Sequence, residues 1–314
     1  MRLAPVIAIA MLATSAPAFA QQSEGGGTRE VVNRVLDSLL GPRQQPQEEA
    51  VVEEEQQAEA VTAAAELQAA LEHPRRAEDS ARDQYRHPVE TLEFFQVQPG
   101  MTVVDFMPSS GWYSRVLIPY LGRDGNYIGL DPVVDDSFSS YWDFVRNTSS
   151  RLPRDARGWV GFDGARVYGL NTDDQMDSFA GTADRVLVFR EMHNMRRFGW
   201  LHDTLVAART LLKDDGLLGM VQHRADESMP TSFVLGDKGY QRETDVINIM
   251  KAYGFDLVAR SEVNANPRDP ANWEEGVWSL PPSYRGAEEG SEERARRAEI
   301  GESDRMTLLF RKRP

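Results

Sequence analysis

Cysteine is absent from this chain of 314 residues. Its absence excludes disulfide bonds, thiolate metal ligands, a cysteine nucleophile and a lipid-modified cysteine. Histidine is scarce as well, with five residues, and no two of them have the i, i+4 spacing of a metal-ligand pair on a helix. We therefore predict no metal site.

Positive charge is in the minority. Lysine and arginine total 35 against 49 aspartates and glutamates, which gives a formal net charge of −14 at pH 7. This balance disfavours nucleic acids and anionic membranes as general partners. The sequence also lacks a Ser-His-Asp order and a phosphate-binding loop with lysine. We expect a small-molecule substrate and no nucleic-acid partner, and the oligomeric state is left open.

Long apolar runs are missing too. The most apolar stretch near the start, residues 3–12, is far shorter than the ~20 residues that span a bilayer. Arg2 precedes this stretch, and Ala18-Phe19-Ala20 has the small-x-small pattern of a cleavage site. We expect a cleavable signal peptide over residues 1–20, a periplasmic or secreted protein, and no membrane insertion after cleavage.

Large apolar residues are also sparse between residues 21 and 80, where glutamate and glutamine cluster. Such a segment buries too little surface to offset its chain entropy. We therefore expect residues 21–80 to be acidic, low in complexity and largely disordered or loosely helical. One α/β domain is expected to follow over residues 81–314, with a charged insert at 283–304.

Within this domain, short apolar runs alternate with amphipathic segments. Strands are expected at 101–106, 126–130, 166–170, 184–189, 217–221, 255–259 and 306–310. Helices are expected at 112–121, 201–212 and 246–253, and residues 213–216 are expected to turn the chain into the fifth strand. The alternation predicts a doubly wound, mostly parallel sheet with ligands at the carboxyl ends of its strands.

Acidic residues end the first two predicted strands. Asp105 precedes the small-residue loop 107–111, and Asp131 ends the second strand. A carboxylate at the second position can accept hydrogen bonds from ribose hydroxyls, so a nucleoside-containing ligand is the leading hypothesis. Alternatively, Asp105 could cap the following helix, and Asp131 could form a turn with Pro132.

Polar residues also follow the fourth and fifth predicted strands. These candidates are His193, Asn194, His223 and Arg224. Parallel pairing would bring them to one cleft, where imidazoles could move protons or hold a metal, or could simply order their loops. Arg224 could clamp an anionic substrate or pair with Glu243, and His87 is expected to approach from before the first strand.

Several short motifs occur in an order typical of one family. They include Arg86-His87-Pro88, Pro99-Gly100-Met101, Gly111-Trp112-Tyr113, Met192-His193-Asn194 and Val221-Gln222-His223-Arg224. Over about residues 80–314 the chain resembles class I S-adenosylmethionine-dependent methyltransferases, and most closely their exported bacterial branch. The resemblance implies a Rossmann-like seven-stranded sheet of order 3-2-1-4-5-7-6, with the last strand antiparallel, and S-adenosylmethionine as cofactor.

The resemblance also implies roles for single residues. The loop from Asp105 through Ser109 to Gly111 would pass beneath the methionine part of the cofactor. Asp131 would hold the ribose hydroxyls, and Asn171 would lie beside the adenine. Asn194 would lie near the methyl acceptor. Independently of the resemblance, His193 or His223 could act as general base if the acceptor is a hydroxyl or an amine.

The loop departs from the family's glycine-rich pattern, because Met107, Ser109 and Ser110 replace glycines. Any of these positions that needs a positive φ would be strained. Two functions therefore stay open. One is an S-adenosylmethionine-dependent methyltransferase of the bacterial envelope with an unknown acceptor. The other is a non-catalytic periplasmic binding or envelope-associated protein that retains the fold. A metal-assisted activity of the histidines is a third, weaker alternative.

Overall fold

The computed structural model describes residues 45–161 and 164–314. The chain forms two units, Met1–Ala58 and Glu59–Pro314, and the second contains the sheet. The expected signal peptide at residues 1–20 lies outside the described residues.

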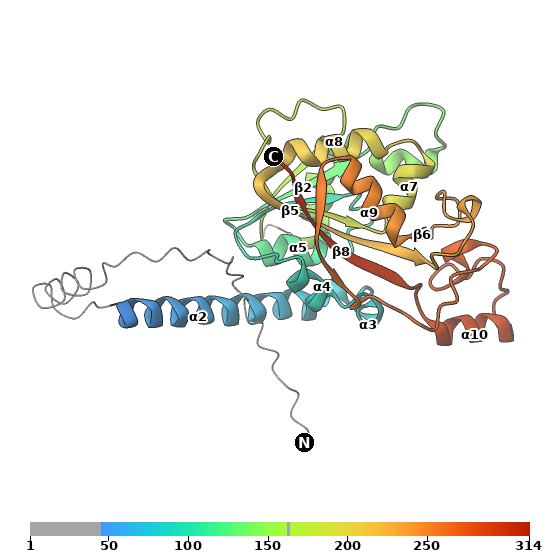
Figure 1. Ribbon diagram of the computed structural model, residues 1–314, viewed down its shortest axis with the longest axis horizontal. Helices are drawn as coiled ribbons and strands as arrows, with labels where there is room; N and C mark the ends of the chain where they lie inside the picture. Colours follow the sequence, from blue (N-terminus) through green and yellow to red (C-terminus); the bar gives the residue numbers. More distant parts are fainter. Residues whose placement is uncertain (1–44, 162–163) are drawn as a thin grey trace, which may run out of the picture. The chain divides into compact units, whose positions relative to one another are not determined.

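The larger unit is built on one sheet (Figure 1). Its main strands are β1 (Thr102–Phe106), β2 (Asn126–Asp131), β3 (Arg166–Asn171), β4 (Ala183–Phe189), β5 (Leu212–Ala225), β7 (Phe255–Ser261) and β8 (Arg305–Lys312). They lie in the order β3-β2-β1-β4-β5-β8-β7, and β6 (Gln241–Arg242) pairs with the end of β5. Only β8 runs antiparallel to its neighbours.

This topology confirms the predicted fold class. With the two-residue β6 set aside, the order is 3-2-1-4-5-7-6 with an antiparallel last strand. All seven predicted strands are present. The predicted turn at 213–216 is wrong, because β5 begins at Leu212, which pairs with Ala183 before the register shifts.

Helices cover both faces of the sheet (Figure 1). One face packs against α4 (Pro88–Phe94), α5 (Ser114–Leu121) and α6 (Thr148–Val160). The other packs against α7 (Met192–Arg197), α8 (Leu201–Leu211) and α9 (Glu243–Ala252). Within the described residues, the other helices are α2 (Gln45–Glu72), α3 (Asp83–Arg86) and α10 (Glu292–Ile300), together with the short 3-10 turns η1 (Pro74–Arg76), η2 (Ser80–Arg82), η3 (Ser140–Val145), η4 (Thr231–Phe233) and η5 (Gly276–Ser279).

Strand residues alternate between these two layers, as the two-residue period of a strand requires. Val104 and Phe106 of β1 join the core under α8 and α9. Val103 joins the core under α5 and α6. Asp105 shares the face of Val103, so its carboxylate lies on the α5 side of the sheet.

The C-terminal part of α2 belongs to the folded unit. Ala63, Leu67, Ala70 and Leu71 are buried, and the last three pack into the core beneath α5. Their spacing of i, i+4, i+7 and i+8 forms one apolar helix face. The compact unit therefore begins near Glu59, about twenty residues before the expected boundary at residue 81.

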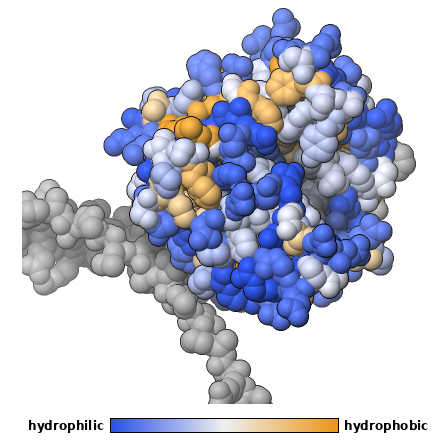
Figure 2. Space-filling model, turned by 90° about the vertical axis from the view of Figure 1, so that its right-hand side faces the viewer, coloured by the Kyte–Doolittle hydropathy of each residue, from blue (hydrophilic) through white to orange (hydrophobic). Residues whose placement is uncertain are grey.

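Hydrophilic side chains cover most of the face shown in Figure 2, and apolar ones form small separate patches. None of the helices in the described residues combines the length and apolar character needed to cross a bilayer.

The buried face of α2 gives a direct test. Leu67→Ala should lower the free energy of unfolding by about 2–4 kcal/mol, the usual cost of truncating a buried leucine. Val61→Ala is the matched control, because Val61 is 67% exposed on the same helix and should change stability by less than about 0.5 kcal/mol. Chemical denaturation of both variants measures the difference. Equal stabilities would contradict the packing of α2 in the core.

Candidate functional site

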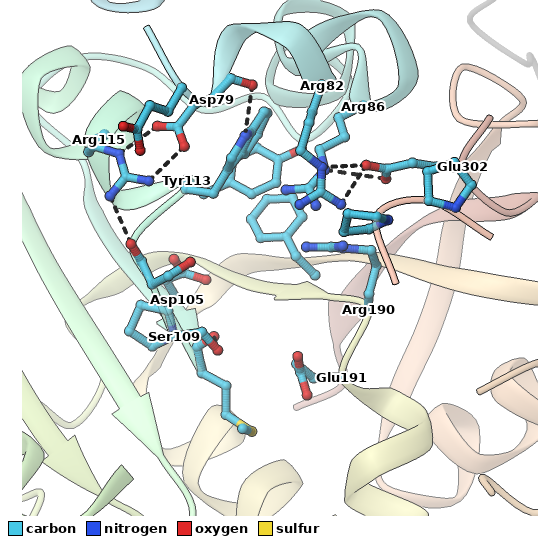
Figure 3. A pocket seen from close by; sticks show the side chains of 18 of the residues that line it. Asp79, Arg82, Arg86, Asp105, Ser109, Tyr113, Arg115, Arg190, Glu191 and Glu302 are labelled. Carbon is cyan, nitrogen blue, oxygen red and sulfur yellow. Dashed lines mark hydrogen bonds and ion pairs between the residues drawn. The ribbon is translucent and has the colours of Figure 1, made fainter. Parts of the chain in front are cut away.

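A cavity of about 960 Å³ opens at the carboxyl edge of the sheet. Residues at the carboxyl ends of β1, β4 and β5 and in the loops after β1 and β4 form its floor, and residues from 74–86, 277–283 and 302–305 form its walls. Figure 3 shows the charged groups that face it. The cavity thus lies where ligands bind in doubly wound folds.

The loop after β1 has a strained backbone. Met107 and Ser109 have φ values of 52° and 50°, a left-handed conformation that glycine adopts at little cost. Ser109 lines the cavity, and its hydroxyl donates to the Met107 carbonyl at 3.2 Å. The loop therefore keeps a glycine-like path without glycine at these two positions.

Gly111 does not line the cavity. Its φ is 80°, and a Cβ there would lie 2.7 Å from the Trp159 ring of α6. Gly111 therefore makes room for the Trp159 ring of α6. It does not serve the close approach of a ligand that the resemblance implies.

Asp105 lines the cavity and is buried. Its Oδ2 accepts a hydrogen bond from the Tyr127 hydroxyl at 2.7 Å. The alternative of a helix cap is wrong, because the cap residue of α5 is Tyr113 and no side chain caps that end. Burial raises the pKa of Asp105 to about 7, so this carboxyl can hold or release a proton near neutral pH.

Two charged residues directly after β4 face the same cavity. Arg190 has a φ of 66° and is strained like Met107 and Ser109 at the same edge. Glu191 is held by Asn194, whose amide donates to Glu191 Oε2 at 2.8 Å. Burial raises the pKa of Glu191 to about 7. Asn194 itself does not line the cavity, but it positions Glu191, which does line the cavity.

A group of arginines, of which Arg86 and Arg305 are buried, surrounds Glu302 at one side of the cavity. Arg82 and Arg86 pair with Glu302 at 2.5 and 3.4 Å, and Arg305 pairs with it as well. Burial alone would raise the pKa of Glu302, but the charges of Arg305, Arg86 and Arg190 lower it to about 2. Glu302 is therefore ionised, and it fixes residues 82–86 against the start of β8.

The two histidines converge as the sequence predicts. Their ring centroids lie 5.5 Å apart. His223 lines the cavity, and its Nδ1 hydrogen-bonds with Ser303 Oγ at 2.6 Å. His193 lies beneath it, and burial lowers its pKa to about 4. Both rings are buried, so both are neutral near pH 7, and only His223 can reach a ligand directly.

Two of the sequence expectations fail in the structure. Arg224 points away from the cavity into a cluster of acids, pairing with Asp304 and Glu262 at 2.9 and 2.7 Å and with Glu243 at 3.7 Å. The alternative reading, a pair with Glu243, is the one seen. His87 lines a separate depression beside α2 and does not cover this edge.

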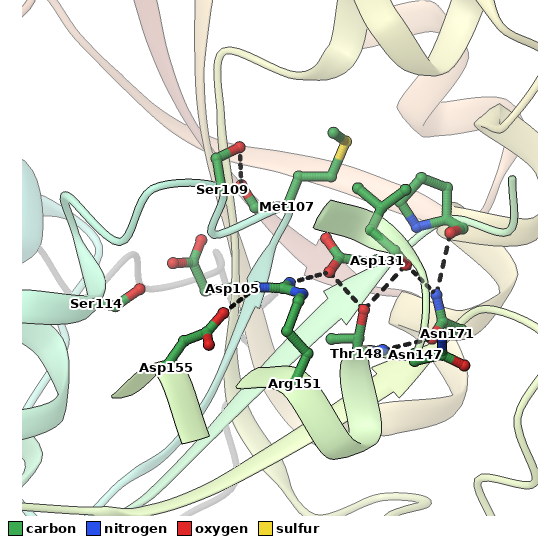
Figure 4. A network of polar contacts seen from close by, with 12 residues as sticks. Asp105, Met107, Ser109, Ser114, Asp131, Asn147, Thr148, Arg151, Asp155 and Asn171 are labelled. Atoms are coloured by element: carbon green, nitrogen blue, oxygen red, sulfur yellow. Dashed lines mark hydrogen bonds and ion pairs between the residues drawn. The ribbon is translucent and has the colours of Figure 1, made fainter. Parts of the chain in front are cut away.

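The predicted nucleoside residues form a closed network (Figure 4). Asp131 is fully buried, and its Oδ2 accepts from Thr148 Oγ1 at 2.6 Å and from Arg151 at 3.2 Å. Asn171 donates to the Pro132 and Val145 carbonyls and accepts from the Thr148 amide. Neither Asp131 nor Asn171 lines the cavity.

The fit of a nucleoside cofactor can be tested on this network. Asp131 Oδ1 is buried without a partner in the described residues, and a ribose hydroxyl could satisfy it. Asp131 is fully buried, however, and Thr148 and Arg151 occupy its other carboxylate oxygen. In this conformation the residues do not fit the cofactor that the resemblance implies.

No group of three or more histidines and acids within the described part of the chain is arranged to hold a metal ion.

Sequence reasoning missed most of the charged cavity lining. The missed residues are Arg82, Arg86, Tyr113, Arg190, Glu191, Glu302 and Arg305. Arg190 and Glu191 carried a signal, because they are the first charged residues after a buried strand. Arg82 and Arg86 belong to a segment that ion pairs with the distant Glu302 hold against the sheet, Tyr113 precedes α5, and Arg305 begins β8.

Comparisons with known proteins bear on the fold. No known family and no curated protein matches the sequence. Solved structures are similar at low identity. An S-adenosylmethionine-dependent methyltransferase from Aquifex aeolicus shares 17% identity and a TM-score of 0.41, over 60% of this chain and 90% of that one.

Two further similar structures are a 1,6-didemethyltoxoflavin-N1-methyltransferase from Burkholderia thailandensis and the cyclase SpnF. The first shares 12% identity and a TM-score of 0.42, over 76% of this chain and 82% of that one. The second shares 16% identity and a TM-score of 0.44, over 77% and 86%. Similarity at this level concerns the fold and not the activity. The strand order itself gives the chain its Rossmann-like methyltransferase fold class.

The strained loop predicts opposite effects for two neighbouring serines. Ser109→Gly relieves a left-handed residue and should be neutral or stabilising, because the relief offsets the entropy of glycine in the unfolded chain. Ser110→Gly gains no such relief and should lose about 0.5–1 kcal/mol. Thermal denaturation of the two variants should rank Ser109→Gly above Ser110→Gly. The reverse order would refute the strain.

The raised pKa of Asp105 predicts a pH dependence. Between its ordinary pKa near 3.8 and about 7, the folded state binds a proton that the unfolded state has lost. This contribution to stability is complete at low pH and disappears as pH rises toward 7. Asp105→Asn should abolish it, so wild type should lose up to about 4 kcal/mol relative to the variant from pH 4 to 7. Urea unfolding across this range measures the difference, and parallel curves would contradict the shift.

Proposed function

We propose that the chain is an exported methyltransferase-like protein that binds a small molecule in the cavity at the carboxyl edge of its sheet. The observation that carries the proposal is the cavity itself, which ionisable groups line where doubly wound folds hold their ligands. The export rests on the sequence of residues 1–20, which has the features of a signal peptide.

Binding without methyl transfer is the function that this geometry favours. Asp131 and Asn171, the residues expected to hold the nucleoside, are bonded to Thr148 and Val145, and the buried His193 is a weak base. The cavity nevertheless offers Asp105 and Glu191, whose pKa values near 7 allow either carboxyl to donate to or accept from a ligand.

A tryptophan substitution tests binding in the cavity. Ser110 lines the cavity and is exposed, so Ser110→Trp should obstruct the cavity. Ser149→Trp, on the exposed side of α6, is the control. In a thermal-shift screen of small envelope metabolites, ligands should stabilise wild type and Ser149→Trp but not Ser110→Trp. A screen in which no compound shows this pattern would contradict the proposal.

S-adenosylmethionine-dependent methyl transfer is the second candidate, and the unpartnered Oδ1 of Asp131 favours it. Binding of S-adenosylmethionine at this position would require Arg151 to release the Asp131 carboxylate. Methyl transfer needs mainly correct positioning of the acceptor, so the low basicity of His193 does not exclude it.

Arg151 therefore gives the test that separates the two functions. If Asp131 can bind a ribose once Arg151 is removed, Arg151→Ala should bind S-adenosylhomocysteine at least about tenfold more tightly than wild type. The reason is that Asp131 no longer needs to break an ion pair. Arg154→Ala, which removes an exposed arginine from the same helix, should match wild type. Isothermal titration of all three proteins provides the affinities. If none of them binds, methyl transfer from this cofactor is excluded.

A further inference from the structure

The arginine group around Glu302 has an unusual charge balance. Four guanidinium groups, those of Arg82, Arg86, Arg190 and Arg305, lie on this side of the cavity with the single carboxylate of Glu302 (Figure 3). Even with the neighbouring Glu191 ionised, positive charge is in excess by two. The whole chain has the opposite sign, at −14. The local excess is therefore a feature of the site and not of the composition.

Burial makes this excess costly. Arg86 and Arg305 are 3% and 2% exposed, and Arg305 Nε is buried without a hydrogen-bond partner in the described residues. Burial lowers the pKa of both guanidinium groups. Buried charges in folded proteins are normally paired, because an unpaired one loses its hydration without compensation. An anion in the cavity would supply that compensation.

Arg190 is the arginine placed to meet such an anion. Its side chain makes no hydrogen bond or ion pair within the described residues, although its backbone amide donates to Val221 at 2.7 Å. Figure 3 shows it extending toward the same side of the cavity as Arg82 and Arg86. A left-handed φ of 66° directly after β4 gives it this position. Strained backbone of this kind is typical of residues that serve a site.

The other arginines are held in fixed positions. The Arg86 guanidinium carbon lies 4.5 Å from the centroid of the Trp112 ring, and Arg86 Nε pairs with Glu302. Arg305 donates from Nη1 to the Tyr85 carbonyl at 3.0 Å. Tyr113, stacked on Phe189 with ring centroids 3.5 Å apart, forms an apolar surface beside them. Guanidinium groups fixed in this way are suited to a planar carboxylate or a phosphate.

We propose that this arginine group is an anion subsite of the cavity, in which Arg190 and Arg86 bind a carboxylate or phosphate group of the ligand. The inference rests on the proposed function and adds its ligand class, a small anionic molecule. Glu302 holds Arg82, Arg86 and Arg305 in place and leaves Arg190 as the group that pairs only when the ligand is bound.

The test uses inorganic phosphate as the probe, titrated calorimetrically at constant ionic strength with chloride as the background anion. Arg190→Gln should weaken phosphate binding tenfold or more and should fold normally, since its guanidinium has no partner to lose. Arg296→Gln removes the same charge from the exposed side of α10 and should bind phosphate like wild type. A phosphate affinity unchanged in Arg190→Gln, or absent in wild type, would overturn the subsite.

A second variant addresses the charge balance. Glu302→Gln removes the acid that pairs with Arg82, Arg86 and Arg305, so it should bind phosphate more tightly than wild type if it folds. If it does not fold, Arg86→Gln should repeat the loss seen with Arg190→Gln. Failure of the subsite stays distinct from failure of the proposed function, because neutral ligands excluded by Ser110→Trp would still bind the Arg190→Gln protein.

The carboxylate of S-adenosylhomocysteine is a second possible source of the same chemistry. If it occupies the subsite, Arg190→Gln should weaken S-adenosylhomocysteine but leave 5′-methylthioadenosine, which lacks the carboxylate, unaffected. If the anion belongs to another ligand, phosphate should still bind in the presence of saturating S-adenosylhomocysteine. Either result supports the subsite and identifies its source.

Discussion

The ion pairs of Glu302 hold together the part of the molecule that makes the cavity. Arg82 and Glu302 are 220 positions apart, and their contact fixes residues 74–86 over the edge of the sheet. A second contact, the bidentate pair of Arg115 with Asp79 at 2.5 and 2.7 Å, ties the same residues to α5. These pairs hold residues that form one wall of the cavity at the carboxyl ends of β1, β4 and β5. Because one carboxylate pairs with Arg82, Arg86 and Arg305, it links residues 82–86 to the start of β8 at a single point.

The fold and the site give different kinds of information about function. The strand order assigns the chain to an architecture that many enzymes share, and architecture alone does not specify chemistry. The site departs from what that architecture leads one to expect. Asp131 and Asn171, at the position where the sequence predicts a nucleoside, bond to α6 and to the chain before it. The open space lies instead on the side of Asp105, Glu191 and the arginine group.

The sequence predicts the sheet well because each buried strand has a recognisable local pattern of apolar residues. Runs such as Val103-Val104 and Val186-Leu187-Val188 are apolar on both faces, which is what a parallel strand covered by two helix layers requires. Strand ends then locate the candidate edge, and Asp105, Ser109 and His223 do line the cavity. Residues 74–86 have no such pattern, because in the sequence their ion-pairing side chains cannot be distinguished from those of a solvated surface. Nor could the sequence show that Arg224 is neutralised by Glu262 and Asp304, or that Thr148 and Arg151 cover Asp131.

The arginine group also governs how quickly an anion can enter and leave. At low ionic strength the net negative charge of the whole chain repels an approaching anion over tens of ångströms, whereas the arginines attract it only within the cavity. Added salt shortens the Debye length to about 8–10 Å and suppresses the distant repulsion first. Association should then become faster as salt rises, which is opposite to the trend for ligands steered by complementary charge. The molecule would thus select anions at close range while slowing their capture from dilute solution.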